Sequence, residues 1–329
     1  MSTTMRDVAR AAGVSVATVS HVVNDKPGAR IGEDARRRVQ EAIIALGYRP
    51  NALAKTLSEG GSRFIGLVAD AIATTPFAGQ IIHGAQDEAW RHGFVLLVAN
   101  TEGNAAAEND AIAMMLEHQV RGILYSTWYH REIEVPPPLQ HTETVLVNCF
   151  AGDDSFPAVV PDEEQGGRTA TEELLAAGHR RIAFLNTTTP SPAREGRLAG
   201  YREAIEDAGV AFDEGLAFET APDQEGGYAA VDGVLASGAT AVFCHNDRVA
   251  MGFYDGLRER GLRIPEDMAV MGFDNQDVIA AHLRPPLSTV ALPHYELGAA
   301  GVRTLLGLDA PAAGARQLVS CPSVPRESL

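Results

Sequence analysis

The stretch VSVATVSHVVN, residues 14–24, decides the fold of the N-terminal part of the chain. Ser15 is a residue type that caps helices, and it directly precedes a segment in which valines recur at helical spacing. Three of these valines share one side and can pack inward: Val19, Val22 and Val23. The opposite side carries side chains that are left free to touch a partner: Val16, Ala17, Ser20 and His21. The stretch therefore predicts a short helix with one buried face and one contact face.

Another short helix is predicted immediately before this one. Thr4 and Asp7 stand three residues apart, close to a capping box, and Gly13 suits the left-handed position that ends a helix. The apolar stripe of this helix is expected to consist of Val8, Ala9 and Ala12. Two short helices joined by a glycine turn indicate a helix-turn-helix, whose second helix presents its first side chains to the DNA major groove.

A third helix is expected after Gly32, because Glu33 and Asp34 favour a helix N-terminus. Gly47 should end it, and its predicted buried face contains Ala35, Val39, Ala42, Ile43 and Leu46. The basic run at residues 36–38 either faces DNA phosphates or is solvated, and the sequence favours neither interpretation.

The next segment, YRPNALAKTLSEGGS (residues 48–62), predicts a hinge helix at about 50–59 with Leu53 and Leu57 one turn apart. A helix of about eight residues is unstable alone in water. The two leucines either contact the rest of the chain or fold on DNA, where one of them would wedge into the minor groove. The glycines at 60–61 favour the second interpretation.

Charge is segregated along the chain. The whole chain carries −16, yet residues 1–61 hold nine Lys or Arg against six Asp or Glu and are therefore +3, which leaves −19 on the other 268 residues. A basic head can touch phosphate while the acidic remainder stays away from it.

The 329 residues predict two or three domains. After residue 61, near-continuous apolar strands alternate with helices, which indicates parallel sheets covered on both faces. One series runs from FIGLVAD (64–70) to PAVVPD (157–162) and a second from the helix at 162–177 to AVMGFD (269–274). Strand LSTVAL (287–292), helix 293–306 and a single strand QLVSCPS (317–323) remain. The expected fold class is α/β, with a small all-α head and two doubly wound parallel-sheet lobes.

Several predicted strands end on polar residues, where open parallel sheets bind ligands. These residues include Asp70, Asn100, Ser126, Asn148, Asn186, Asn246 and Asp274. Any one of them can also be explained as a turn residue. Three aromatic residues follow strands or begin a helix and can cover a sugar ring or simply pack in a core: Phe77, Trp128 and Tyr129.

Residues 5–24, MRDVARAAGVSVATVSHVVN, followed by RPNALAKTL, resemble the head of the LacI/GalR (lactose-repressor) family of bacterial transcription regulators, and the resemblance continues through nearly the whole chain. It implies that Val16, Ala17 and His21 choose the operator and that Leu57 is the minor-groove wedge. It also places Arg197 of PAREGRLAGYREA, with Asn246 and Asp274, in an effector cleft. The implied body is periplasmic-binding-protein-like, with discontinuous lobes at 62–161 plus 291–320 and at 162–290 plus 321–329.

Two sets of site residues follow from the pattern and the resemblance together. The predicted DNA-binding residues are Thr4, Ser15, Val16, Ala17, Thr18, Ser20, His21, Asn24, Tyr48, Asn51, Ala54, Lys55 and Leu57. The predicted effector-binding residues are Asp70, Phe77, Ser126, Trp128, Asn148, Asn186, Arg197, Asn246 and Asp274.

Other classes of protein lack sequence support. No GxGxxG follows the first strand, and neither a phosphate-binding GxxxxGK[ST] loop, nor GxSxG, nor HEXXH is present. Three isolated cysteines, Cys149, Cys244 and Cys321, are expected to be buried thiols. No apolar run reaches the ~18 residues of a membrane span. We expect no enzyme activity, no metal, no cofactor and no membrane partner, and a cytoplasmic location.

The predicted function is therefore that of a transcriptional repressor that binds a palindromic operator in double-stranded DNA as a homodimer. A small-molecule effector in the cleft, which we expect to be a neutral sugar, would control it; a phosphosugar, a nucleoside and a purine are the alternatives. The other hypothesis is a constitutive architectural DNA binder or an activator with a vestigial body, which would gain no thermal stability from any sugar.

Overall fold

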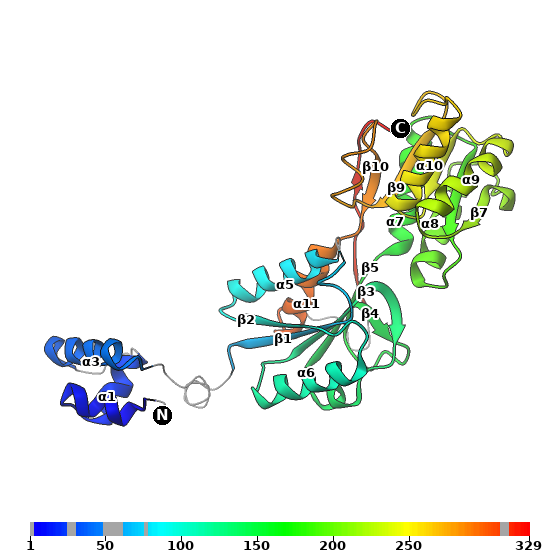
Figure 1. The fold of residues 1–329 in the computed structure, drawn as a ribbon. Coiled ribbons are helices and arrows are strands. Elements are labelled where there is room, and N and C mark those ends of the chain that lie inside the picture. The colour runs from blue at the N-terminus through cyan, green and yellow to red at the C-terminus, as the bar shows by residue number, and fades with distance from the viewer. Residues whose placement is uncertain (1–2, 25–30, 49–61, 76–77, 310–315) are drawn as a thin grey trace. The chain divides into compact units, whose positions relative to one another are not determined.

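The computed structural model describes residues 3–24, 31–48, 62–75, 78–309 and 316–329 (Figure 1). The chain divides into two compact units, Met1–Arg63 and Phe64–Leu329, which we call the head and the body. The hinge helix predicted at about 50–59 lies outside the described residues.

The head contains α1 (Met5–Ala12), α2 (Val16–Val23) and α3 (Glu33–Leu46). Thr4 and Asp7 form the predicted capping box on α1, and Gly13 ends it in the left-handed conformation with a φ of 64°. The hydroxyl of Ser15 accepts a hydrogen bond from the backbone N–H of Thr18 and so caps α2. The helix-turn-helix predicted from residues 14–24 is confirmed.

The core of the head lies among its three helices, and the residues that form it are Val8, Ala9, Ala12, Val19, Val22, Val39, Ala42 and Tyr48. The prediction that Leu46 is buried is wrong, because its side chain is 39% exposed. Gly47 adopts a φ of 57°, which reverses the chain, and Tyr48 then packs into the core at that end of α3.

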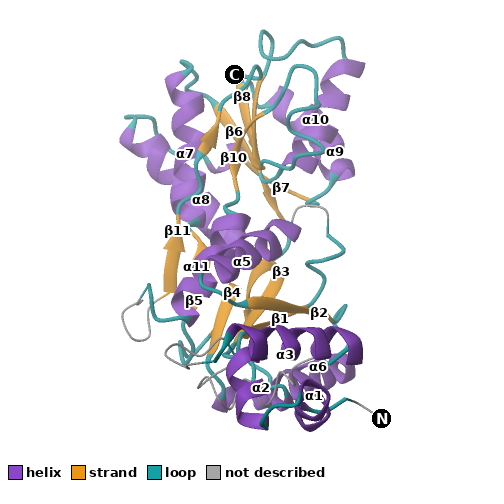
Figure 2. Ribbon diagram, turned by 90° about the vertical axis from the view of Figure 1, so that its left-hand side faces the viewer, coloured by secondary structure: helices purple, strands orange, loops and turns teal. Residues whose placement is uncertain are grey.

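The body has two lobes, each a six-stranded sheet with helices on both faces (Figure 2). In the first lobe, all strand pairs are parallel and the order is β11-β5-β4-β3-β1-β2. Helices α5 and α11 pack against each other on one face, while α6 and η1 pack together on the other. The elements are β1 (Phe64–Ala69), α5 (Gly79–Arg91), β2 (Val95–Asn100), α6 (Ala105–Glu117), β3 (Ile123–Ile133), η1 (Pro137–His141), β4 (Thr144–Ala151), β5 (Ala158–Pro161), α11 (His294–Leu305) and β11 (Arg316–Val319).

The second lobe has the strand order β12-β10-β9-β8-β6-β7, in which only the β10–β12 pair is antiparallel. Helices α7 and α8 cover one face, and α9 and α10 cover the other. Its elements are α7 (Glu163–Ala176), β6 (Ile182–Thr187), α8 (Pro192–Asp207), η2 (Glu214–Leu216), β7 (Ala217–Thr220), α9 (Gln224–Ala236), β8 (Ala241–Cys244), α10 (Asp247–Glu259), β9 (Ala269–Asp274), β10 (Ser288–Ala291) and β12 (Ser323–Val324).

In the described part of the body, the chain passes between the lobes after β5, after β10 and after β11. The expected single strand at 317–323 is therefore wrong. Residues up to Val319 pair with β5 in the first lobe, whereas Ser323 and Val324 pair with β10 in the second. The α/β class with parallel sheets covered on both faces is confirmed.

Two further features of the structure concern the cysteines and the length of the helices. All three cysteines are buried free thiols, as predicted, and burial raises the pKa of Cys149 to about 12. None of the helices described is both long and apolar enough to cross a membrane.

Candidate nucleic-acid interface and ligand cleft

The first turn of α2 is the exposed end of the helix-turn-helix. Val16 is 43% exposed and Ala17 is also exposed, whereas His21, one turn later, is half-buried. The hydroxyls of Ser15 and Thr18 lie 2.9 Å apart and hold the cap. This turn therefore offers two small apolar side chains and one imidazole to a partner.

The structure distributes the other predicted DNA-binding residues among several places. Thr4 is bonded to Asp7 through both its backbone N–H and its hydroxyl, and Asn24 donates to the hydroxyl of Ser20 at 3.4 Å. Tyr48 lies in the core of the head and is only 7% exposed. The remaining four lie outside the described residues: Asn51, Ala54, Lys55 and Leu57.

The basic run on α3 is partly paired with acids of its own helix. Arg37 binds Asp34 at 2.6 Å and Glu41 at 3.1 Å, and Arg38 lies 3.5 Å from Asp34. These are exposed pairs, which contribute little to stability and can exchange for other anions.

A cavity of about 300 Å³ lies between the lobes at the carboxyl ends of their strands. Five of the predicted effector-binding residues line it, namely Trp128, Asn148, Arg197, Asn246 and Asp274. The other lining residues are Tyr129, His130, Glu163, Thr187, Thr189, Ser191, Ala193, Pro222, His245, Arg248, Leu292 and His294.

Close packing of α7 against α8 builds the charged centre of this cavity. A Cβ atom on Gly200 would lie 2.0 Å from the carbonyl oxygen of Glu164, so only glycine permits this approach. The approach brings Glu163 of α7 next to Arg197 of α8. Nε of Arg197 donates to Oε2 of Glu163 at 2.9 Å, and both side chains are buried.

The guanidinium of Arg197 is fixed by three further contacts. It donates from Nη1 to the carbonyl of His245, lies 3.9 Å from Oδ1 of Asp274, and stacks 3.6 Å from the ring centre of Phe273. A guanidinium held on so many sides keeps one orientation in the cavity.

The buried ionisable groups have strongly shifted pKa values. Burial raises the pKa of Glu163, but the charge of Arg197 and the neighbouring His130 outweigh it and lower the pKa to about 2. Burial raises the pKa of Asp274 to about 6, against the opposing effect of Arg197. Burial lowers the pKa of His294 to about 4 and that of His245 well below its usual range. The last two imidazoles are therefore neutral at pH 7 and can both donate and accept hydrogen bonds.

A bulge in β3 supplies the first-lobe wall of the cavity. The register with β4 shifts between Ser126 and Arg131, and the intervening Trp128, Tyr129 and His130 line the cavity. The rings of Trp128 and Tyr129 meet edge to face, with centres 4.8 Å apart. The cleft thus has an aromatic wall on one side and charged groups on the other.

Two of the predicted amides that line the cavity also have structural bonds. Asn246 caps α10: its Oδ1 accepts from the backbone N–H of Val249 at 2.9 Å and its Nδ2 donates to the carbonyl of Pro222 at 3.1 Å. Asn148 has a left-handed φ of 59° and donates to the carbonyl of Thr127 at 3.0 Å.

Three predicted effector residues are not among the lining residues. Asp70 accepts from the backbone N–H of Trp128 at 2.9 Å and pairs with Arg131 at 3.0 Å, so it supports the bulge. Ser126 donates to the carbonyl of Val147. Asn186 donates to the carbonyl of Arg194. Phe77 lies outside the described residues.

Sequence reasoning did not select five ionisable residues of the cavity: His130, Glu163, His245, Arg248 and His294. Glu163 is in the first turn of α7, where acidic residues are common in any helix, so its position does not indicate a ligand site. His245 and Arg248 flank the predicted Asn246, and that proximity was the available signal.

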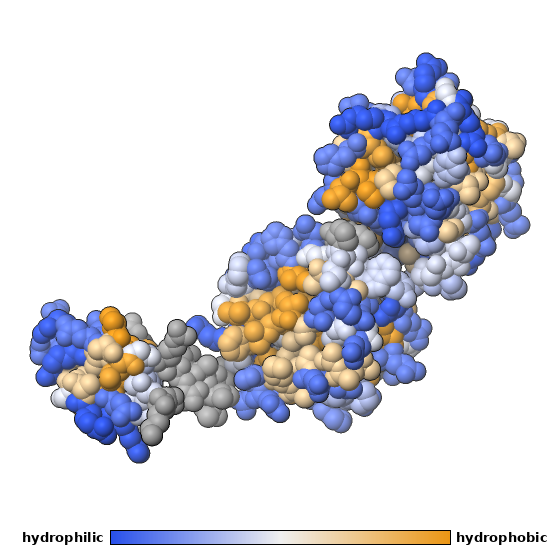
Figure 3. Space-filling view, viewed as in Figure 1, coloured by the Kyte–Doolittle hydropathy of each residue, from blue (hydrophilic) through white to orange (hydrophobic). Residues whose placement is uncertain are grey.

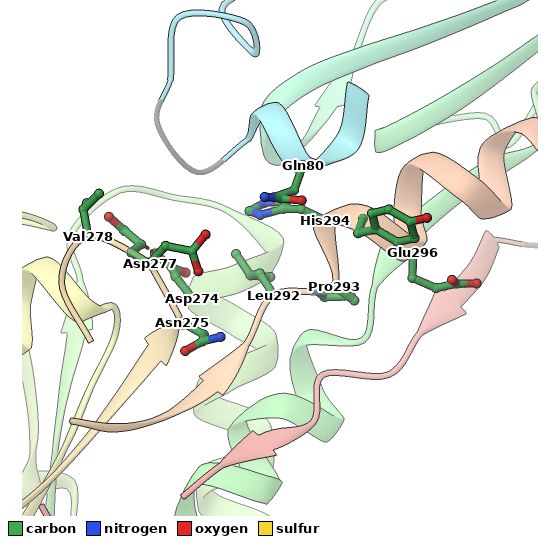
Figure 4. A pocket seen from close by; sticks show the side chains of 11 residues that line it. Gln80, Asp274, Asn275, Asp277, Val278, Leu292, Pro293, His294 and Glu296 are labelled. Atoms are coloured by element: carbon green, nitrogen blue, oxygen red, sulfur yellow. Dashed lines mark hydrogen bonds between the residues drawn. The ribbon is translucent and has the colours of Figure 1, made fainter. Parts of the chain in front are cut away.

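A second cavity, of about 440 Å³, adjoins the first and shares Asp274, Leu292 and His294 with it. Figure 4 shows Gln80 of α5 next to His294, with Asp274 and Asp277 across from them. In the described ranges, no group of three or more His, Cys, Asp or Glu residues could hold a metal ion in either place.

Comparison with known proteins agrees with this geometry. Residues 4–51 match the profile of bacterial regulatory proteins of the lacI family, and residues 171–329 match that of the periplasmic binding protein-like domain. The chain is 33% identical to the ribose operon repressor of Haemophilus influenzae, over 99% of this chain and 98% of that one. It is 34% identical to the HTH-type transcriptional repressor PurR of Vibrio atlanticus, over 92% and 91%.

Solved structures show the same likeness. The lac repressor dimer bound to operator is 26% identical, with a TM-score of 0.79 over 100% of this chain and 99% of that one. The complex of the transcriptional regulator CelR with cellobiose is 28% identical, with a TM-score of 0.65 over 99% of each chain.

Proposed function

The chain belongs to the LacI family of bacterial regulatory proteins, and from that premise we propose that it represses transcription as a homodimer on a palindromic operator under the control of a sugar. Its relatives are regulators of transcription and not enzymes. The observation that carries the proposal is the pairing, in one chain, of an exposed recognition turn with a half-open cavity between two lobes.

The proposed operator reading uses the first turn of α2. Val16 and Ala17 have no hydrogen-bonding groups and read thymine methyls and groove shape, while His21 bonds to a purine edge. The net charge of +3 on residues 1–61 supplies attraction to phosphate. Binding should therefore weaken steeply as salt rises.

A neutral monosaccharide is the effector that the cavity favours. The carboxylates of Glu163 and Asp274 balance the positive charges of Arg197 and Arg248. The cavity therefore has no excess charge that would attract a charged ligand. A volume of about 300 Å³, with an aromatic wall opposite polar groups, suits a single sugar ring. We choose D-ribose as the first probe because a ribose operon repressor matches 99% of the chain.

The homodimer is supported by an apolar area on the first lobe. Figure 3 shows apolar side chains gathered on this lobe. At the edge strand β2 and the nearby helices α5 and α6, large apolar residues are exposed: Trp90, Val95, Val98, Met114 and Leu116. Exposed apolar surface of this kind is typical of a protein interface, and two-fold symmetry would match that of a palindrome.

Control by the effector would work through lobe closure. A ligand between the lobes contacts both, so its binding biases their relative position. We propose that this bias reaches the predicted hinge at 50–59 and favours or melts its helices. A coupling of ~1–3 kcal/mol would change operator occupancy by one to two decades.

Gel shifts on a palindromic operator, with and without D-ribose, test the proposal with two variants. Leu57→Ala should weaken operator binding strongly and leave sugar affinity unchanged, because the proposed role of this residue is insertion into the minor groove and not contact with the sugar. Arg197→Ala should abolish the sugar response while operator binding persists, and Arg263→Ala, at an exposed arginine of the same lobe, serves as its control. Operator occupancy indifferent to every sugar tried would favour the constitutive architectural binder instead.

A further inference from the structure

His130 is a largely buried residue of the cavity, and its ring nitrogens make no hydrogen bond of normal length to the described protein residues. Its side chain is only 9% exposed, and it meets the ring of Phe150 edge to face at 5.7 Å. Among the described residues, neither ring nitrogen has a hydrogen-bond partner. Burying such a group without a partner is costly, which indicates that something else in the cavity supplies one.

Glu163 faces His130 from the other lobe. Its Oε2 accepts from Arg197, while its Oε1 lies 3.4 Å from Nδ1 of His130. The carboxylate is ionised at neutral pH because its pKa is about 2, and an ionised carboxylate can only accept. The nitrogen that faces it is therefore the one that can donate to it, and Nε2 is the nitrogen that Glu163 does not face.

We propose that His130 contacts the effector, held by Glu163 in the Nδ1–H form so that Nε2 accepts a hydrogen bond from a ligand hydroxyl. This inference rests on the proposed function and deepens it by naming the ligand group that is recognised, a hydroxyl. A hydroxyl can donate to Nε2, whereas a phosphate or carboxylate group has no proton to give. The ligand class is therefore a neutral polyol at this position.

The arrangement also links recognition to lobe position. His130 belongs to β3 of the first lobe, and Glu163 belongs to α7 of the second. The imidazole is oriented only while the two lobes hold these residues together. A sugar that uses Nε2 therefore gains affinity in that arrangement and stabilises it.

Nitrogen NMR of the full-length protein with ¹⁵N-labelled histidine tests the orientation without any ligand. We expect the His130 ring to be protonated at Nδ1 and bare at Nε2, and we expect Glu163→Gln to let the other tautomer appear. His130→Gln identifies the signals by removing them, and His118→Ala, at an exposed histidine just after α6, should leave them in place. A wild-type ring protonated at Nε2, alone or together with Nδ1, would overturn the proposal, as would a tautomer that Glu163→Gln leaves unchanged.

Calorimetry with D-ribose as the probe tests the contact itself. His130→Ala should weaken binding about tenfold, the effect of one lost hydrogen bond, and His118→Ala should not change it. Wild-type affinity for D-ribose in His130→Ala would overturn the contact. If wild-type protein binds no D-ribose, the sugar assignment of the proposed function fails, while the tautomer measurement still decides the role of Glu163 and His130.

Discussion

The helix caps of the head and the ion pairs of the cleft depend on contacts that reach very different distances along the chain. The side-chain bonds that cap α1 and α2 join near neighbours, Thr4 with Asp7 and Ser15 with Thr18. In the cleft, Arg197 binds Glu163, 34 residues before it, and the carbonyl of His245, 48 residues after it. Local bonds form with their own helix, whereas the cleft bonds require a folded lobe. A change in the cleft should therefore disturb a whole lobe, and the loss of one of these helix caps should stay local.

Removing Glu163 should have the largest effect. In Glu163→Leu, Arg197 loses its closest carboxylate and remains buried, with Asp274 3.9 Å away as the remaining acid. We expect the free energy of unfolding of the body to fall by about 3–5 kcal/mol. Urea unfolding followed by circular dichroism measures this loss, and hydrogen exchange shows whether it spreads through α7 and α8.

The control for this experiment is the double variant Glu163→Leu with Arg197→Met. It removes both charges and keeps apolar volume, so most of the lost stability should return. If the free energy of unfolding of Glu163→Leu fell by less than ~1 kcal/mol, or if the loss were confined to the first turn of α7, the expected difference between cleft and head would be contradicted.

This contrast also explains which features could be predicted from the sequence. The capping box, the left-handed Gly13 and the buried valines of α2 all depend on residues within one or two turns, and the sequence shows them directly. Arg197, Asn246 and Asp274 line the cavity, and their selection came from the family resemblance and not from spacing.

The features that could not be predicted depend on tertiary structure. The apolar pattern of residues 317–323 is that of one strand, and although the resemblance implied a lobe boundary at 320/321, the pattern itself does not show that the strand ends at Val319. His130 reaches the cavity because β3 bulges between Ser126 and Arg131, and alternation along a strand does not reveal a bulge. Glu163 lies next to Arg197 only because α7 packs closely against α8. The glycines that permit this close packing lie in α8, a later segment of the chain.

Glycine has a different purpose in the cleft and in the head. Gly200 permits close packing of two helices, whereas Gly47 adopts a left-handed conformation. Gly200→Ala would place a Cβ 2.0 Å from a backbone oxygen of α7 and force the helices apart. We expect a loss of about 2–3 kcal/mol in the body and weaker binding of D-ribose, since Arg197 would move. Gly47→Ala meets nothing within 4 Å and suffers only from its left-handed φ, so it should cost about 1 kcal/mol within the head. Thermal unfolding and hydrogen exchange of both variants measure the difference, and equal losses would contradict it.

Acidity should affect the cleft and leave the head unaffected. Asp274 has a folded-state pKa of about 6, above its usual 3.8, so its charge destabilises the fold at pH 7. As pH falls from 7 to 5, the folded state takes up the proton first, and wild type should gain about 1–2 kcal/mol over Asp274→Asn. The stability that Glu163 contributes is lost only as pH falls from 4.5 towards its pKa of about 2, below this window. Urea titrations of both proteins at pH 7 and pH 5 measure the gain, and parallel pH profiles would rule out Asp274 as its source.

The smallest expected effect is that of Ser15→Ala, which removes the acceptor for the Thr18 N–H at 3.1 Å. The loss should be about 1 kcal/mol, because one helix cap is worth that much, and hydrogen exchange should show it in α2 alone. Operator affinity should fall with the fraying of the recognition turn, while D-ribose affinity stays at the wild-type value because no cleft bond is involved. Ser15→Thr keeps the hydroxyl and should behave as wild type. A Ser15→Ala protein whose sugar affinity also fell would mean that the head and the cleft do not act as separate cooperative units, since a purely local bond would then have a distant effect.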